Sequence, residues 1–114
     1  IMDNKVDIRM PEVRVVDYIT KVPFHRSLTV VEHTLTSNDE FTPDTGVGKP
    51  SALSPIVGYG AWYRLTADGT HTPTFSGFKK HSASGDWVVT LDVVNVIAFL
   101  FDGVDYWYSI VQAQ

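Results

Sequence analysis

Two tryptophans stand beside charged side chains at the spacing of one face of a β-strand. Arg64 follows Trp62 by two residues, and Asp105 precedes Trp107 by two residues. Successive side chains of a strand point to opposite faces, so residues two apart share a face. An indole ring stacks on the apolar face of a sugar ring, and a charged neighbour can hydrogen-bond the sugar hydroxyls. Trp62, Arg64, Asp105 and Trp107 are therefore the candidate ligand-binding residues.

A structural role competes with this interpretation. The chain has three Trp, five Tyr and six Phe, and a small β domain needs large side chains to fill its core. Trp87 shares a face with Val89 and Leu91, and this alternation predicts a core position. The flat faces of the other two indoles would also suit a protein partner.

The remaining reactive side chains form no recognisable catalytic or metal-binding pattern. The four His (His25, His33, His71 and His81) are scattered, cysteine is absent, and most Asp residues stand in turn sequences, where they stabilise the turn. There is no Gly-x-Ser-x-Gly motif and no glycine-rich phosphate loop. We expect no enzyme, no metal and no cofactor. A hydrolase site assembled from distant strands is the alternative that one sequence leaves open.

Composition indicates one ordinary globular domain. The 114 residues are 44% hydrophobic and 19% charged, with a net charge of -4. A single core is expected from this length, and the absence of a basic cluster argues against nucleic-acid binding. The longest apolar run is far shorter than the roughly 20 residues of a membrane-spanning helix. The start, Ile1-Met2, without an apolar leader, indicates a module cut from a longer protein.

The pattern of the chain predicts an all-β domain. No segment has a sustained helical period, and short β-branched and aromatic runs recur between turn residues. The fold class expected is a jelly-roll-like β-sandwich of about eight strands, with antiparallel pairing throughout. The expected strands are residues 5–10, 13–19, 27–35, 59–67, 70–78, 86–91, 93–101 and 104–111.

The end of the chain predicts a β-hairpin about Asp102-Gly103. An Asp-Gly pair between such runs favours a two-residue turn, because both central positions need positive φ. Counting outward pairs Phe101 with Val104 and Phe99 with Tyr106. The expected core face carries Ile97, Phe99, Phe101, Tyr106, Tyr108 and Ile110. The opposite, mixed face carries Val96, Ala98, Leu100, Asp105, Trp107 and Ser109, as a ligand platform or second packing surface would.

A second Asp-Gly pair, Asp68-Gly69, predicts another hairpin. Outward counting places Thr66 opposite His71, Arg64 opposite Pro73 and Trp62 opposite Phe75.

Between the expected strands, residues 36–58 hold three Pro and three Gly. Both residue types disfavour strands, so we expect a loop with at most a short edge strand near residues 52–57. It is either a binding loop or the long crossover of a jelly roll.

The segment from Leu65 to Ile110 resembles C-terminal modules of phage and prophage tail or fibre-associated virion proteins. The likeness lies in LTADGTHTPTFSGF, SGDWVVT and VVNVIAFLFDGVDYWYSI and covers about 40% of the chain. It implies a non-catalytic β-sandwich that attaches to host surfaces or glycans, in the virion or outside the cell, within a homotrimer in some arrangements. Such modules also resemble jelly-roll carbohydrate-binding modules.

The function expected from the sequence is therefore binding of a polysaccharide or cell-surface glycan, with no nucleic-acid or membrane partner. The alternative is a structural virion module whose mixed face is buried in a trimer. Exposure of Trp62 and Trp107 in a monomer would favour the first.

Overall fold

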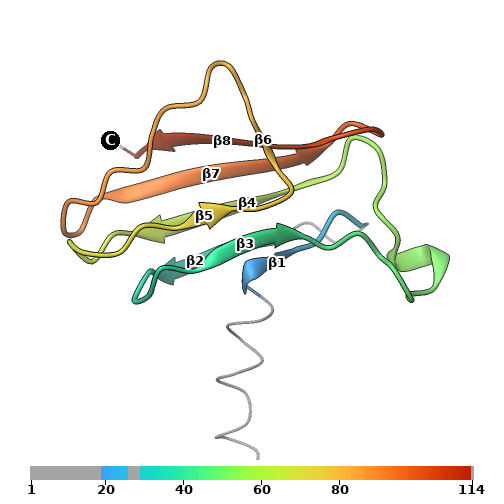
Figure 1. Ribbon diagram of the computed structural model, residues 1–114, viewed down its shortest axis with the longest axis horizontal. Coiled ribbons are helices and arrows are strands. Elements are labelled where there is room, and N and C mark those ends of the chain that lie inside the picture. The colour runs from blue at the N-terminus through green and yellow to red at the C-terminus, as the bar shows by residue number, and fades with distance from the viewer. Residues whose placement is uncertain (1–18, 26–28, 114) are drawn as a thin grey trace, which may run out of the picture.

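The protein is a two-sheet, sandwich-like β structure. The computed structural model describes residues 19–25 and 29–113. A three-stranded sheet has the order β1-β3-β5, and a five-stranded sheet has the order β2-β4-β7-β8-β6 (Figure 1). The smaller sheet contains β1 (Lys21–Val22), β3 (Glu40–Pro43) and β5 (Thr74–Phe75). The larger contains β2 (Thr29–Thr34), β4 (Gly60–Thr66), β6 (Lys79–Lys80), β7 (Val94–Phe101) and β8 (Tyr106–Gln112), and a short 3-10 helix, η1, spans Ser51–Leu53.

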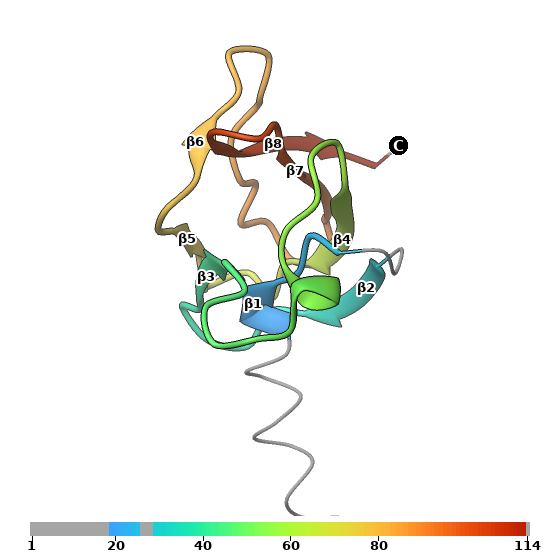
Figure 2. The same cartoon turned by 90° about the vertical axis from the view of Figure 1, so that its right-hand side faces the viewer.

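The sheets are mixed, so the expectation of antiparallel pairing throughout is wrong. Among the described residues, β4–β7 and β7–β8 pair antiparallel, whereas β1–β3, β2–β4, β3–β5 and β6–β8 pair parallel. Parallel neighbours need a crossover between them, and the chain supplies it by passing repeatedly from one sheet to the other. Seen along the strands, the two sheets surround a common interior (Figure 2). The all-β class is confirmed.

The core lies between the two sheets and follows the alternation of β4 and β7. Tyr63 and Leu65 of β4 are fully buried, while Trp62 and Arg64 between and beside them are exposed. Tyr63 meets Phe99 of β7 edge-on at 5.2 Å between ring centroids, a favoured aromatic geometry. From the smaller sheet, Phe41 reaches the same cluster and lies 5.8 Å from Tyr63. Aromatic packing therefore joins the sheets.

The hairpin at Asp102-Gly103 exists, but its loop is longer than expected. Phe101 pairs with Tyr106, so residues 102–105 form a four-residue connection in place of a two-residue turn. Asp102 favours this loop, because its Oδ1 accepts the N–H groups of Val104 and Asp105. The register is shifted by two residues, and an even shift leaves every side chain on its predicted face. The predicted core face is confirmed: Ile97, Phe99 and Ile110 are buried, and Phe101, Tyr106 and Tyr108 pack against them.

The hairpin predicted at Asp68-Gly69 does not form. Thr66, Arg64 and Trp62 pair with Val94, Val96 and Ala98 of β7. The next strand, β5, instead joins β3 in the other sheet. The Asp-Gly turn is present, since Gly69 has φ +89° and Asp68 accepts the N–H groups of Thr70 and His71. It turns the chain from one sheet to the other.

Several other expected strands differ. The strand at residues 5–10 lies outside the described residues, as does that at 13–19 except for Ile19. Residues 86–91 form a loop rather than a strand, and 36–58 contain β3 and η1 instead of an edge strand near 52–57. Because β3 belongs to the smaller sheet while β2 and β4 belong to the larger, this segment is a structural crossover.

Candidate functional site

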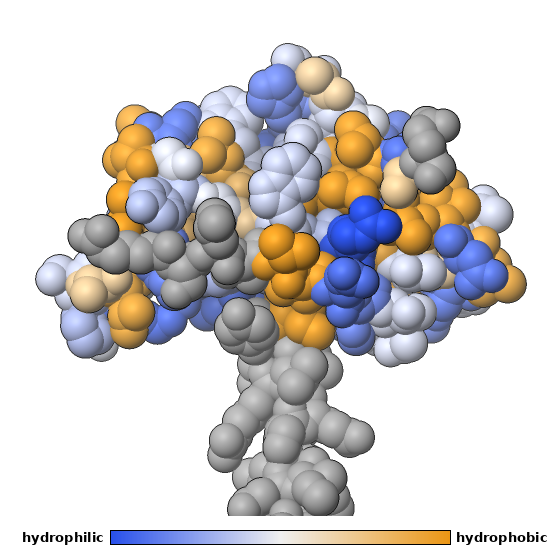
Figure 3. All heavy atoms as spheres, turned by 180° about the vertical axis from the view of Figure 1, so that it is seen from behind, coloured by the Kyte–Doolittle hydropathy of each residue, from blue (hydrophilic) through white to orange (hydrophobic). Residues whose placement is uncertain are grey.

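The outer face of the five-stranded sheet, which points away from the core, carries the candidate residues. The strand register places these side chains on it: Val30, Glu32, Thr34, Trp62, Arg64, Thr66, Val94, Val96, Ala98, Leu100, Trp107, Ser109 and Val111. Trp62 is 55% exposed and Leu100 is 43% exposed. Figure 3 shows the molecule from behind, where hydrophobic clusters reach the surface between hydrophilic ones. This outer face is therefore mixed in polarity, as the sequence indicates.

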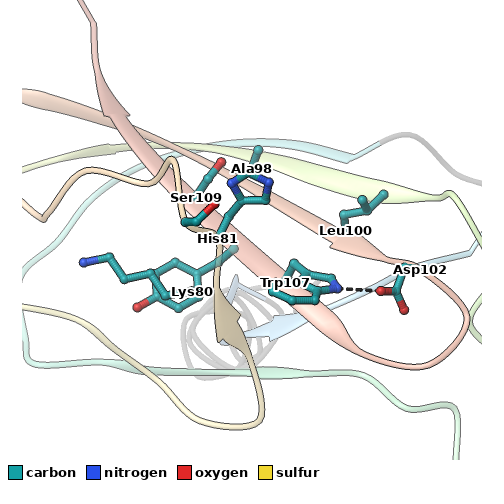
Figure 4. Close-up of a pocket in the computed structure, with 9 residues that line it drawn as sticks. Lys80, His81, Ala98, Leu100, Asp102, Trp107 and Ser109 are labelled. Carbon is teal, nitrogen blue, oxygen red and sulfur yellow. Dashed lines mark hydrogen bonds between the residues drawn. The ribbon is translucent and has the colours of Figure 1, made fainter.

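A hollow of about 570 Å³ lies where β6, β7 and β8 meet. We call it the Trp107 hollow; its lining is Lys80, His81, Ser82, Ala98, Leu100, Asp102, Trp107, Tyr108 and Ser109. Figure 4 shows Trp107 and Leu100 between Asp102 at one end and His81 and Ser109 at the other. The middle is thus apolar and the two ends are polar, which is the usual composition of a small-molecule site.

Asp102 fixes the orientation of the Trp107 ring. The indole Nε1 donates to Asp102 Oδ2 at 2.7 Å, while Oδ1 accepts the N–H groups of Val104 and Asp105. The Asp105 N–H, followed by the indole N–H and the Val104 N–H, lowers the pKa of the Asp102 carboxyl. The carboxyl group is therefore ionised near neutral pH, and Trp107 is held without packing into the core.

At the other end, His81 presents a defined donor. Its Nδ1 accepts the N–H of Ala83 at 3.0 Å, so the ring hydrogen of the neutral form lies on Nε2. The backbone N–H of His81 bonds to the carbonyl of Tyr108, which ties this segment to β8. The ring lies edge-on to Trp107 with centroids 6.4 Å apart. His81 and the Ser109 hydroxyl therefore supply polar groups opposite Asp102.

Lys80, which lines the Trp107 hollow, and Lys79 beside it are paired with carboxylates outside the hollow. Lys79 Nζ lies 3.1 Å from Asp105 Oδ2 and 5.8 Å from the centroid of Trp107. Lys80 binds Asp86, and its amine extends away from Trp107 (Figure 4). Asp105, predicted as a ligand contact, thus serves in this structure as the partner of Lys79.

Trp62 lines a second hollow, of about 680 Å³, together with Gly58, Tyr59, Gly60, Ala98, Phe99 and Leu100. Ala98 and Leu100 border both this Trp62 hollow and the Trp107 hollow. Trp62 pairs with Ala98, and Trp107 pairs with Leu100 across β7. Two strand spacings and two residues along β7 place the backbones of the two tryptophans about 12 Å apart. An extended ligand could contact both rings over Ala98 and Leu100.

Arg64 belongs to a third hollow, of about 410 Å³, with Glu32, His33, Thr34, Thr66 and Val94. The four predicted site residues are therefore on or beside one sheet face, but they do not converge on one point. Sequence reasoning missed Asp102, His81 and Leu100. The alternation places Leu100 on the mixed face but does not single it out. The role of Asp102 is hidden because an aspartate in an Asp-Gly pair is already explained by its turn. His81 gives no signal because it follows a strand of only two residues.

Trp87 lies away from this face. It packs against the core, and its buried Nε1 has no hydrogen-bond partner within the part of the chain that the structure describes. Trp87 therefore contacts the core as expected, but the alternation on which that expectation rested is wrong, because residues 86–91 form no strand and Val89 and Leu91 are exposed.

In the described ranges, no group of three or more His, Asp or Glu side chains is placed to hold a metal ion. Nor do residues 19–25 and 29–113 contain a helix long and apolar enough to cross a membrane. No family model, curated protein or solved structure matches the chain.

Proposed function

We propose that the protein is a non-catalytic module that binds a polysaccharide or cell-surface glycan on the outer face of the five-stranded sheet. The observation that carries this proposal is the Trp107 hollow, in which a fixed indole lies between polar ends. A sugar ring has apolar C–H faces and polar edges. Stacking would use Trp107 and Leu100, and the hydroxyls would meet Asp102, His81 and Ser109.

Preorganisation also supports binding at this position. The Asp102 bond fixes Trp107 before a ligand arrives, and rigid groups lose less conformational entropy on binding. Trp62, beyond Ala98 and Leu100, would provide a second stacking position on an extended chain. In this proposal, Arg64 and Asp105 contribute at the periphery.

The setting that we propose is the virion or the extracellular space, in keeping with the resemblance of residues 65–110 to phage tail and fibre modules. We also propose that the fold is jelly-roll-like and related to that of carbohydrate-binding modules.

One observation favours the alternative of a structural virion module. Val30, Leu100 and Val111 are 67%, 43% and 55% exposed on the same outer face, and aliphatic side chains gathered on a surface often mark a protein interface. Burial of this face in a homotrimer would account for them. Sedimentation of the purified chain tests this: a trimer that dissociates on Leu100→Glu supports assembly, whereas a monomer supports glycan binding.

A panel of immobilised polysaccharides and host-cell envelopes tests the proposed function. The intact chain is expected to bind at least one, and Trp107→Ala is expected to lose that binding with its fold retained. Trp107→Phe is the matched variant, because it keeps an aromatic face but loses the bond to Asp102. Intermediate binding by Trp107→Phe would indicate stacking. Binding that is unchanged in Trp107→Ala would refute the site.

A further inference from the structure

The Trp107 hollow has a carboxylate at its rim that forms no ion pair among the described residues. Asp102 lies at its rim, and its two carboxylate oxygens accept hydrogen bonds from uncharged donors alone among the described residues: two backbone N–H groups and an indole. No ion pair of the described chain includes Asp102. Its negative charge is therefore not neutralised by a bonded cation, and Asp102 lines the hollow.

Two cations lie close to Asp102: Lys80 lines the hollow, and Lys79 Nζ lies 5.8 Å from the centroid of the Trp107 ring. Lys79 and Lys80 are committed to Asp105 and Asp86 respectively. Each of these pairs is neutral as a unit, and the Lys80 amine extends away from Trp107 (Figure 4). The donor at the far end is the imidazole Nε2–H of His81, whose Nδ1 accepts the Ala83 N–H.

From this arrangement we infer that the Trp107 hollow selects neutral sugars over acidic ones, with Asp102 as the residue that determines this specificity. The inference rests on the proposed function and names its ligand class. A sugar hydroxyl can donate to the lone pair that remains on Asp102 Oδ2, since Oδ1 already accepts two N–H groups and Oδ2 accepts one. A sugar carboxylate cannot donate when ionised, and a unit charge within about 5 Å of Asp102 would weaken binding about three- to tenfold.

Asp102 to Asn is the informative substitution. An asparagine Oδ1 can accept the same two backbone N–H groups, so the loop of residues 102–105 is retained while the charge is removed. Its Nδ2 cannot accept the indole N–H of Trp107, so both affinities are expected to fall and the ratio of the two affinities is the readout. The chain offers a matched control in Asp68, which caps the other Asp-Gly turn with the same kind of bonds. Asp68→Asn changes the net charge by the same amount, but Asp68 lines neither the Trp107 hollow nor the Trp62 hollow.

The test is calorimetric titration of the whole chain with gluco-, galacto- and manno-oligosaccharides, each compared with its counterpart oxidised to the uronic acid at C6. The original chain is expected to bind a neutral oligosaccharide at least about threefold more tightly than its acidic counterpart. Asp102→Asn is expected to bring the two affinities together, and Asp68→Asn to leave their ratio unchanged.

Tighter binding of the uronic acid by the original chain would overturn the inference while supporting glycan binding, as would an unchanged ratio in Asp102→Asn. Binding of none of these oligosaccharides would overturn both proposals. If Asp102→Asn does not fold, salt dependence of the original chain decides: added salt should improve binding of the acidic counterpart relative to the neutral one, because it screens repulsion. A ratio independent of salt would contradict the inference.

Discussion

At the residue scale, single aspartates organise both Asp-Gly turns. Asp68 accepts the N–H groups of His71 and Thr70 through Oδ1, and its Oδ2 lies 2.6 Å from His71 Nδ1. These bonds, the His71 N–H foremost, lower the pKa of Asp68 from 3.8 to about 2. Asp102 has a lowered pKa for the same kind of reason. Each carboxylate therefore stabilises its turn in the ionised form.

The lowered pKa of Asp68 predicts how stability depends on acid. A carboxyl with a lowered pKa in the folded state contributes stability above its unfolded pKa and loses it as the pH falls through the folded value. The Asp68 contribution should thus be complete above pH 3.8 and lost as the pH falls through about 2. Carbon-detected NMR titration should give Asp68 a midpoint near 2. A midpoint at or above its ordinary value would contradict the hydrogen bonding described here.

Gly103 should tolerate a side chain poorly. Its φ is +99°, and an added Cβ would lie 3.1 Å from Cγ2 of Val57. Gly103→Val should therefore lower the free energy of unfolding by about 1 to 3 kcal/mol, since a β-branched residue is strained at positive φ. Thr45→Ala on the exposed crossover should change it by about 0.5 kcal/mol or less. Urea denaturation compares the two variants, and equal stabilities would be inconsistent with the turn.

At the scale of elements, β4 and β7 leave no room for a side chain at Gly60. A Cβ added there would lie 2.1 Å from the carbonyl oxygen of Phe99, whereas one added at Gly58 would meet nothing within 4 Å. Gly60→Ala must therefore displace β7, and Gly58→Ala meets only the strain of its positive φ. We expect Gly60→Ala to cost more than the roughly 1 kcal/mol of that strain. Thermal unfolding of both variants measures the difference, and the reverse order would argue against the β4–β7 register.

Asn95 anchors the loop of residues 81–93 to β7. It is fully buried, accepts the N–H of Val88 and donates to the Val88 carbonyl, and it also accepts a bond from Gln112. Asn95→Ala would leave the half-buried N–H and carbonyl of Val88 without this partner, so a loss of about 2 to 3 kcal/mol is expected. Asn38→Ala, which removes one exposed acceptor of the Thr72 N–H, should cost less. Chemical denaturation measures both, and equal losses would contradict the anchoring role.

The long strands could be predicted from the sequence, but the short ones could not. β2, β4, β7 and β8 have β-branched and aromatic residues in alternation, which is a local signal. β1, β5 and β6 have two residues each, too few to show a period. Parallel pairing joins segments that are distant in the chain, so turn residues such as Asp68-Gly69 cannot reveal whether the next strand stays in the same sheet.

For the candidate site too, the sequence could predict what depends on local alternation but not what depends on long-range strand pairing. The face shared by Trp62 and Arg64, and that shared by Trp107 and Ser109, could be derived from alternation along each strand. The contribution of His81 could not, because it depends on the β6–β8 pairing. The role of Asp102 depends on a four-residue loop that Asp-Gly does not specify uniquely.

At the scale of the whole molecule, the three tryptophans should respond differently to truncation. Trp87→Ala should lower the free energy of unfolding by about 2 to 4 kcal/mol, because its ring packs against the core. Trp62→Ala should cost about 0.5 kcal/mol or less, since that ring is largely exposed. Trp107→Ala should cost about 1 kcal/mol for the lost bond to Asp102. Equal losses in the free energy of unfolding for all three variants would contradict the assignment of Trp87 to the core and of Trp62 and Trp107 to the outer face.

The most direct test of glycan binding on the outer face is a nitrogen–proton NMR spectrum recorded during titration with the polysaccharide fragment that the panel selects. The chain has three indole N–H groups, one from each tryptophan. The signals of Trp107 and Trp62 should shift with increasing ligand, and that of Trp87, whose Nε1 is buried, should stay in place. Shifts confined to Trp87, or equal shifts at all three, would contradict the account.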